Sequence, residues 1–176
     1  MRFDLNKVSI DKVEEVWDAV SEYEPEELSD AIEKLAIEQP DLYEYLESAP
    51  DEFSDAEVNF QICLGLVVYE SMKSANPLLP TILWDDLIEQ EEANVTMLQS
   101  LEGESDGDGL AVVQEMYSNY PQPEILGSLS AMLMADEEED EDEEETAEME
   151  DAPEISPENK GSIFITLKTM LDCLNK

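Results

Sequence analysis

The sequence predicts an all-α protein, an irregular multi-helix domain around one buried central helix. Apolar residues recur at helical spacing through most of the chain, and prolines or short polar stretches separate these segments. No segment alternates apolar and polar residues over enough positions to compete as a β-strand. The central helix is expected over about residues 54–75, with the sequence SDAEVNFQICLGLVVYESMKSA.

Two features identify this central helix. Ser54 is followed three residues later by Glu57, which is the reciprocal capping box that satisfies the first free amides of a helix. From Phe60 to Tyr69 nearly every side chain is apolar, and a helix that is hydrophobic on all sides must be covered on all sides. The apolar run is far shorter than the roughly 18 residues of a membrane span. We therefore expect this helix to be buried inside a helical domain.

Three helices are expected before the central one. Ser9 is suited to cap a first helix whose apolar positions begin at Ile10. Pro25 suits the first position of a second helix, which should end before Pro40 because proline cannot continue a helix interior. A short third helix is expected over Asp41–Ser48.

A long fifth helix is expected over about residues 81–101, after the break NPLLP at 76–80. Glu89 to Glu92 should lie on its solvent side. Its apolar stripe consists of Trp84, Leu87, Ile88, Val95, Leu98 and Leu101. Further short helices are expected over 110–120 and from about residue 125.

The C-terminal part contains a run of acidic residues. Ten consecutive acids repel one another, so residues 136–151 should be disordered in water. We expect a helical domain at 1–135, an acidic low-complexity linker at 136–160 and an amphipathic helix at 161–176. A linker of about 25 residues reaches roughly 25–30 Å as a flexible coil. The last helix can therefore pack on the domain or on a partner.

The charge of the chain is extreme. Eight Lys and Arg stand against 47 Asp and Glu, which gives a net charge of −39, and Lys73 is the only basic residue between Leu35 and Asn159. Such a field repels nucleic acid and anionic membranes and speeds encounters with basic partners. Solubility alone, or a salt-rich source environment, would be alternative explanations. The charge predicts a basic protein partner, and no direct binding to nucleic acid or membranes.

The composition favours a protein that is not an enzyme. The absence of histidine removes Ser–His and Cys–His nucleophile pairs and His-containing zinc sites, and the two cysteines cannot form a Cys₄ zinc site. No phosphate-binding glycine pattern occurs. Carboxylate pairs are abundant, but no spacing marks a catalytic pair, so a carboxylate-based hydrolase is the least favoured function.

The N-terminus lacks the apolar segment of a secretion signal, so a cytoplasmic location is expected.

One local pattern is typical of a calcium site. It consists of Glu104, Asp106, Asp108, Gly109 and Glu115. Their spacing matches the third and fifth ligand positions, the turn glycine and the closing bidentate glutamate of an EF-hand loop. Glu104 stands where aspartate is expected, and Val112 occupies the ninth position without a side-chain oxygen. Calcium is the one cofactor that the sequence suggests, and an ordinary acidic loop is the alternative.

The leading functional hypothesis is a non-catalytic acidic protein that binds a basic protein partner. The candidate partner-binding residues are Asp136, Glu137, Glu138, Glu139, Asp140, Glu141, Asp142, Glu143, Glu144 and Glu145. One alternative is a nucleic-acid mimic or immunity-type inhibitor, whose carboxylates would imitate phosphates at about one charge per 1.7 Å of duplex. An alternative of another class is a calcium-responsive protein that uses the loop at 104–115.

Calcium binding can be tested by thermal unfolding. If the loop is a site, millimolar calcium should raise the melting temperature because the ion binds only the folded loop, and Glu115→Gln should abolish the increase. Magnesium at the same concentration is the control for non-specific screening of the negative charge. Equal shifts with both ions that persist in Glu115→Gln would contradict the calcium hypothesis.

Overall fold

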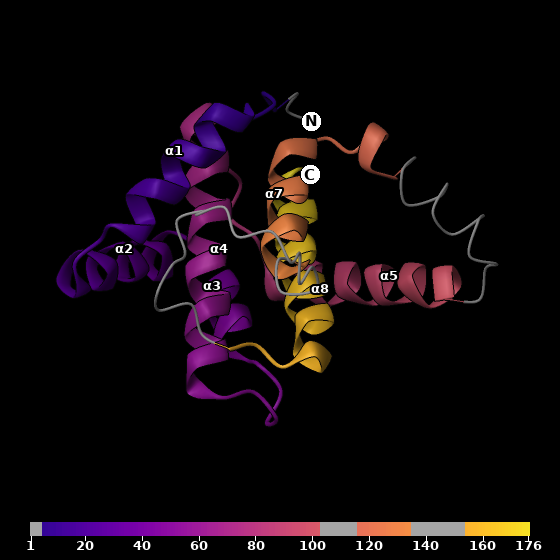
Figure 1. The fold of residues 1–176 in the computed structure, drawn as a ribbon. Coiled ribbons are helices and arrows are strands. Elements are labelled where there is room, and N and C mark those ends of the chain that lie inside the picture. Colours follow the sequence, from indigo (N-terminus) through magenta and orange to yellow (C-terminus); the bar gives the residue numbers. More distant parts are fainter. Residues whose placement is uncertain (1–4, 103–115, 135–153) are drawn as a thin grey trace, which may run out of the picture.

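The computed structural model describes residues 5–102, 116–134 and 154–176 (Figure 1). These residues form helices and contain no strand, which confirms the predicted all-α class. Residues 116–119 add one helical turn between α5 and α7. The helices with described bounds are α1 (Ile10–Ser21), α2 (Pro25–Glu38), α3 (Pro40–Glu47), α4 (Asp55–Ala75), α5 (Trp84–Glu102), α7 (Pro123–Met134) and α8 (Pro157–Leu174).

The helix starts follow local chemistry. Pro25, Pro40 and Pro157 stand at the first positions of α2, α3 and α8, where a missing N–H removes no hydrogen bond. At the start of α4 the backbone N–H of Glu57 donates to Ser54 Oγ at 3.2 Å, and the N–H of Ser54 donates to Glu57 Oε2 at 2.8 Å. The capping box therefore satisfies two amides that the helix itself cannot pair.

Two helix starts differ from the prediction. α5 begins at Trp84 rather than near residue 81, because the preceding segment is tied to the α2–α3 junction. The N–H of Ile82 donates to Gln39 Oε1 at 2.9 Å, and the N–H of Trp84 donates to Asp41 Oδ2 at 2.8 Å. α8 begins at Pro157 rather than at 161. Residues 157–160, which were expected in the linker, therefore form the first turn of this helix.

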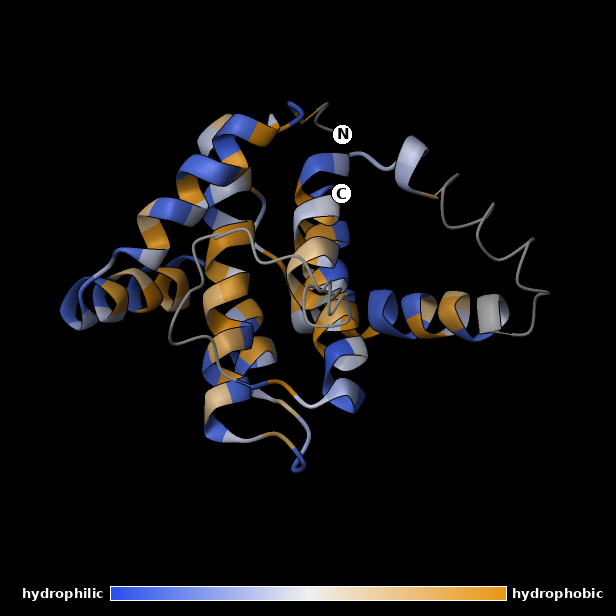
Figure 2. Cartoon of the chain, in the orientation of Figure 1, coloured by the Kyte–Doolittle hydropathy of each residue, from blue (hydrophilic) through white to orange (hydrophobic). Residues whose placement is uncertain are grey.

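The middle of α4 is buried on every side. It packs against α1, α2, α3, α7 and α8. The consecutive residues Leu64–Tyr69 are all buried, and six neighbours in a row occupy every face of a helix. Figure 2 shows hydrophobic colour along most of its length, whereas α1 and α2 show alternating stripes. The elements around α4 therefore cover all faces of its middle part.

α3 approaches α4 at a position without a side chain. A Cβ atom on Gly65 would lie 2.6 Å from Leu46 Cδ1, which is inside van der Waals contact. Next to it, Gln61 Nε2 donates to the backbone carbonyl of Leu46 at 2.8 Å, so the polar side chain inside the apolar run of α4 is satisfied. The two contacts fix the end of α3 on α4.

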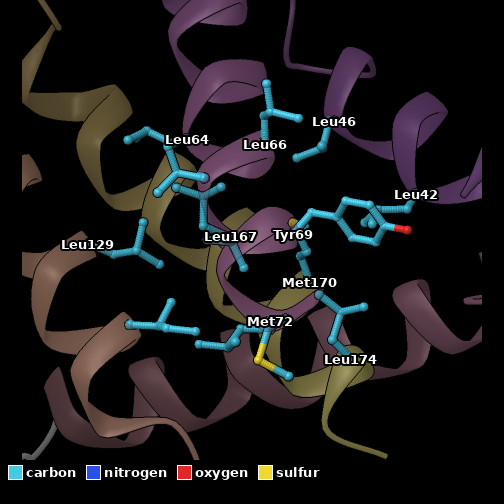
Figure 3. Packing of buried hydrophobic residues seen from close by; sticks show 14 of the residues in the cluster. Leu42, Leu46, Leu64, Leu66, Tyr69, Met72, Leu129, Leu167, Met170 and Leu174 are labelled. Carbon is cyan, nitrogen blue, oxygen red and sulfur yellow. The ribbon is translucent and has the colours of Figure 1, made fainter. Parts of the chain in front are cut away.

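α8 supplies the last cover for α4. It packs against α4, α5 and α7, and Leu167, Met170, Leu171 and Leu174 have no exposed surface. Figure 3 shows three of these side chains among buried residues of α3, α4 and α7. In this structure the C-terminal helix packs on the helical body as part of its core.

The burial of α4 can be tested with two matched substitutions. Leu64 has no exposed surface, whereas Leu78 is 91% exposed. Leu64→Asp should abolish cooperative thermal unfolding, because an unpaired buried carboxylate costs several kcal/mol, comparable with the roughly 5–15 kcal/mol stability of a domain. Leu78→Asp should melt like the wild type. Circular dichroism measures both, and wild-type melting of Leu64→Asp would show that this face of α4 is not buried.

Candidate functional site

A groove of about 710 Å³ lies between α3, α5 and α8. One face of α5 forms its long wall, with side chains at intervals of three or four residues that share a side of the helix. The residues of this wall are Trp84, Ile88, Glu91, Val95, Leu98 and Gln99. α8 contributes Glu158, Gly161, Ser162, Ile165 and Thr166, and α3 with the loop after it contributes Tyr45, Ser48, Ala49 and Pro50. The groove thus joins three elements that are far apart in the sequence.

The apolar wall of the groove corrects the prediction for α5. Ile88 and Val95 are each 37% exposed, although the sequence placed them on a stripe facing the core. Among the described side chains of α5, the buried ones are Leu87, which belongs to the predicted stripe, and Asn94, which does not, at 0% and 3% exposure. α5 extends beyond α8 in Figure 1, so the helix it crosses covers only part of its apolar surface. The rest of that surface lines the groove.

Glu91 also lies differently from the prediction. It lines the groove and is half-buried, whereas the sequence placed it on the solvent side. The Trp84 ring packs edge to face on Tyr45, with ring centroids 6.1 Å apart. Tyr45 is 6% exposed, and its hydroxyl has no hydrogen-bond partner among the described residues. Burial raises the pKa of Tyr45, and the nearby Glu91 carboxylate raises it further. The Glu91 carboxylate therefore lies close to the buried phenol of Tyr45, whose ring packs on Trp84.

A buried polar network fixes the crossing of α5 and α8. Lys168 Nζ donates to Asp172 Oδ2 at 2.7 Å and to Asn94 Oδ1 at 2.8 Å. Asn94 Nδ2 in turn donates to Thr169 Oγ1 and to Asp172 Oδ2, each at 3.0 Å. Tyr120 donates its hydroxyl to Asp172 Oδ1 at 2.5 Å. Because these bonds are directional, they set the position of one helix on the other and so the shape of the groove.

The polar groups of this network make their hydrogen bonds with one another. The side chains of Lys168 and Asp172 are 6% and 15% exposed. Burial raises the pKa of Tyr120, and Asp172 raises it further, so the phenol stays a hydrogen-bond donor. The sequence carried two signals of this cluster: Lys168 and Asp172 are spaced i, i+4 within an apolar helix, and Asn94 interrupts the pattern of α5. The cluster positions the groove and presents no free group to it.

Glu57 positions the other end of α8. Its Oε1 atom accepts hydrogen bonds from the N–H of Ser156 at 3.0 Å and from Asn159 Nδ2 at 2.9 Å. Hydrogen bonds from Ser54, Asn159 and Ser156 lower the pKa of Glu57 to about 2. One carboxylate therefore caps α4 and holds the first turn of α8, beside the mouth of the groove. The sequence indicated only the capping role.

Two further clefts flank Trp17. One of about 240 Å³ lies between α1, α4 and α7, and one of about 380 Å³ lies between α1, α2 and α4. Both are lined by Trp17 and Val67, and Glu14 and Asp18 stand on the first. They are smaller than the groove between α3, α5 and α8, and no unpaired buried polar atom lines them.

The site residues predicted from the sequence lie outside the described residues. Glu104, Asp106, Asp108 and Glu115 belong to 103–115, and the acids from Asp136 to Glu145 belong to 135–153. The calcium loop and the acidic run therefore stay predictions. In the described ranges no three carboxylate or cysteine side chains are grouped as ligands of a metal ion.

Comparison with known proteins gives no further guide. No family model, no curated protein and no solved structure matches the chain. None of the helices within the described ranges is both long and apolar enough to cross a bilayer. The candidate site therefore rests on the geometry and charge of its own residues.

Glu57 gives stability a specific dependence on pH. Its pKa of about 2 in the folded protein lies below the ordinary value of 4.5, so its contribution is complete above about pH 4.5 and is lost as the pH falls toward 2. The stability difference between wild type and Glu57→Gln should therefore shrink over this interval, as measured by urea unfolding at each pH. Asp55→Asn, an exposed change on the same helix turn, is the control. A difference that is constant with pH would contradict the assignment.

Proposed function

We propose that this chain is a non-catalytic acidic protein that binds a basic protein partner. The observation that carries the proposal is the placement of the few cations. Lys73, the only base between Leu35 and Asn159, is itself ion-paired with Glu38, and Lys168 is buried with Asp172. The long helix α5 carries several carboxylates and no base. These two lysines are thus paired with carboxylates of the fold, and in the whole chain 47 acids stand against 8 bases.

An uncompensated surface charge of one sign acts mainly on the rate of association. It attracts an oppositely charged protein before contact, and it opposes association with like-charged chains. The acidic run at 136–151 contributes 13 of the 47 acids, so the remaining chain keeps a net charge of −26 out of −39. The helical body therefore provides most of the attraction, and the run extends it.

The proposal predicts a steep dependence on salt. Association with a basic partner recovered by affinity capture should slow markedly between 0.1 M and 1 M salt, because the screening length falls from about 10 Å to about 3 Å. Replacing 136–151 by a Gly/Ser segment of equal length should lower the association rate without abolishing binding. Stopped-flow or surface-binding kinetics give both rates.

Two results would contradict this proposal. A captured partner that is itself acidic would remove the electrostatic basis, and rates that are indifferent to salt would do the same. If the isolated 136–151 peptide binds the partner while the replaced protein does not, binding belongs to the run and the helical body is not the binding surface.

A further inference from the structure

We propose that the groove between α3, α5 and α8 binds a basic amphipathic helix of the partner. The helix would place its apolar side chains on Ile88 and Val95, and a lysine or arginine beside Glu91. This inference rests on the proposed function, since it assumes a basic partner, and it adds the place and the form of the contact.

The apolar wall of the groove has the length and spacing of a helix-binding surface. From Trp84 to Leu98 the wall covers fourteen residue steps of α5, or about 21 Å at 1.5 Å per residue. A partner helix of about 14 residues matches this length. Ile88 and Val95 lie two turns apart on the wall and are both exposed, so side chains at i, i+3, i+4 and i+7 of a partner helix can pack on them.

The groove also contains a place for one cation. The half-buried carboxylate of Glu91 attracts a positive charge more strongly than a solvated one, because fewer waters screen it. Tyr45 lies near this carboxylate, but its hydroxyl is buried and takes no part in the contact. The Trp84 ring, which packs edge to face on Tyr45, also lines the groove. One half-buried carboxylate thus stands on an otherwise mostly apolar wall.

The charge of the groove decides between occupants. Its lining residues include Glu91 and Glu158 and no lysine or arginine. An anionic segment or a phosphate-bearing ligand would meet carboxylates without a compensating cation. A second copy of the chain would bring its own Glu91 and Glu158 toward the same acids. A basic helix satisfies both the apolar wall and the carboxylates.

The two tryptophans report the place of binding. The chain contains only Trp17 and Trp84, and only Trp84 lines this groove. The probe is a 15-residue Leu/Lys peptide with helical spacing and no tryptophan, and a scrambled peptide of the same composition is its control. In Trp17→Phe the amphipathic peptide should shift the emission of Trp84. In Trp84→Phe the emission of Trp17 should stay unchanged.

Matched substitutions test the two contacts. Glu91→Gln should weaken binding of the amphipathic peptide about tenfold, as expected for a lost charged hydrogen bond, whereas Glu92→Gln on the exposed side of α5 should change it less than about twofold. Ile88→Ser should also weaken binding, whereas Ile37→Ser on α2, where Ile37 is 74% exposed, should not. Fluorescence anisotropy gives the dissociation constants, and circular dichroism verifies that each variant is folded.

The outcomes separate this inference from the function on which it rests. If both peptides bind equally and Glu91→Gln behaves like Glu92→Gln, the groove is not used, and the proposed electrostatic function stands alone. If the peptide shifts the emission of Trp17 and not that of Trp84, the peptide binds at the clefts beside α1 and not in the groove. If neither peptide binds at low salt, the proposed function fails as well. A dimer of the free protein that Ile88→Ser dissociates would assign the groove to a second copy.

Discussion

The cover of α4 by α8 is the contact on which the rest of the structure depends. The middle of α4 is apolar on all sides, and among the described helices α8 packs on it together with α1, α2, α3 and α7. The two helices are joined by hydrogen bonds between Glu57 and residues near 156–159, about a hundred positions away in the chain. The entropy of closing so long a loop grows only slowly with length, and the fully buried side chains of α8 offset it. α8 in turn provides the surface on which α5 and α7 pack.

The parts of the fold that depend on neighbours in sequence were predictable. Capping residues, prolines at first helical positions and apolar spacing are local signals, and they gave the class and most helix bounds within a few residues. The apolar pattern of α5 gave a helix but not its neighbours, so it could not show that Leu87 faces the core while Ile88 faces a groove. The groove itself was not predictable, because its three walls meet only in the tertiary structure. The pairing of Tyr120 with Asp172 was hidden for the same reason.

The scarcity of cations links the interior of the protein to its surface. Lys73 pairs with Glu38 between α4 and α2, and Lys168 pairs with Asp172 where α5 crosses α8. Burying such a pair is costly in desolvation, and Asn94 and Tyr120 reduce that cost by satisfying the remaining hydrogen-bonding capacity. Each of these lysines neutralises one carboxylate of the fold, so the pairs order the helices without changing the net charge. The negative field of the surface comes from the excess of 47 acids over 8 bases.

A long-range field and an apolar groove have separable effects on binding. The field acts over roughly 10 Å at moderate salt and accelerates the approach of any basic chain, so it distinguishes partners by charge alone. In the proposed binding mode the groove acts only in contact, where apolar area and the pairing of one half-buried carboxylate govern the rate of dissociation. Glu91 contributes to both the field and the groove, since it carries a negative charge and lies on the groove wall between Ile88 and Val95. In the proposed binding mode, discrimination among basic partners arises at the groove, because a uniform negative surface offers every such partner the same attraction.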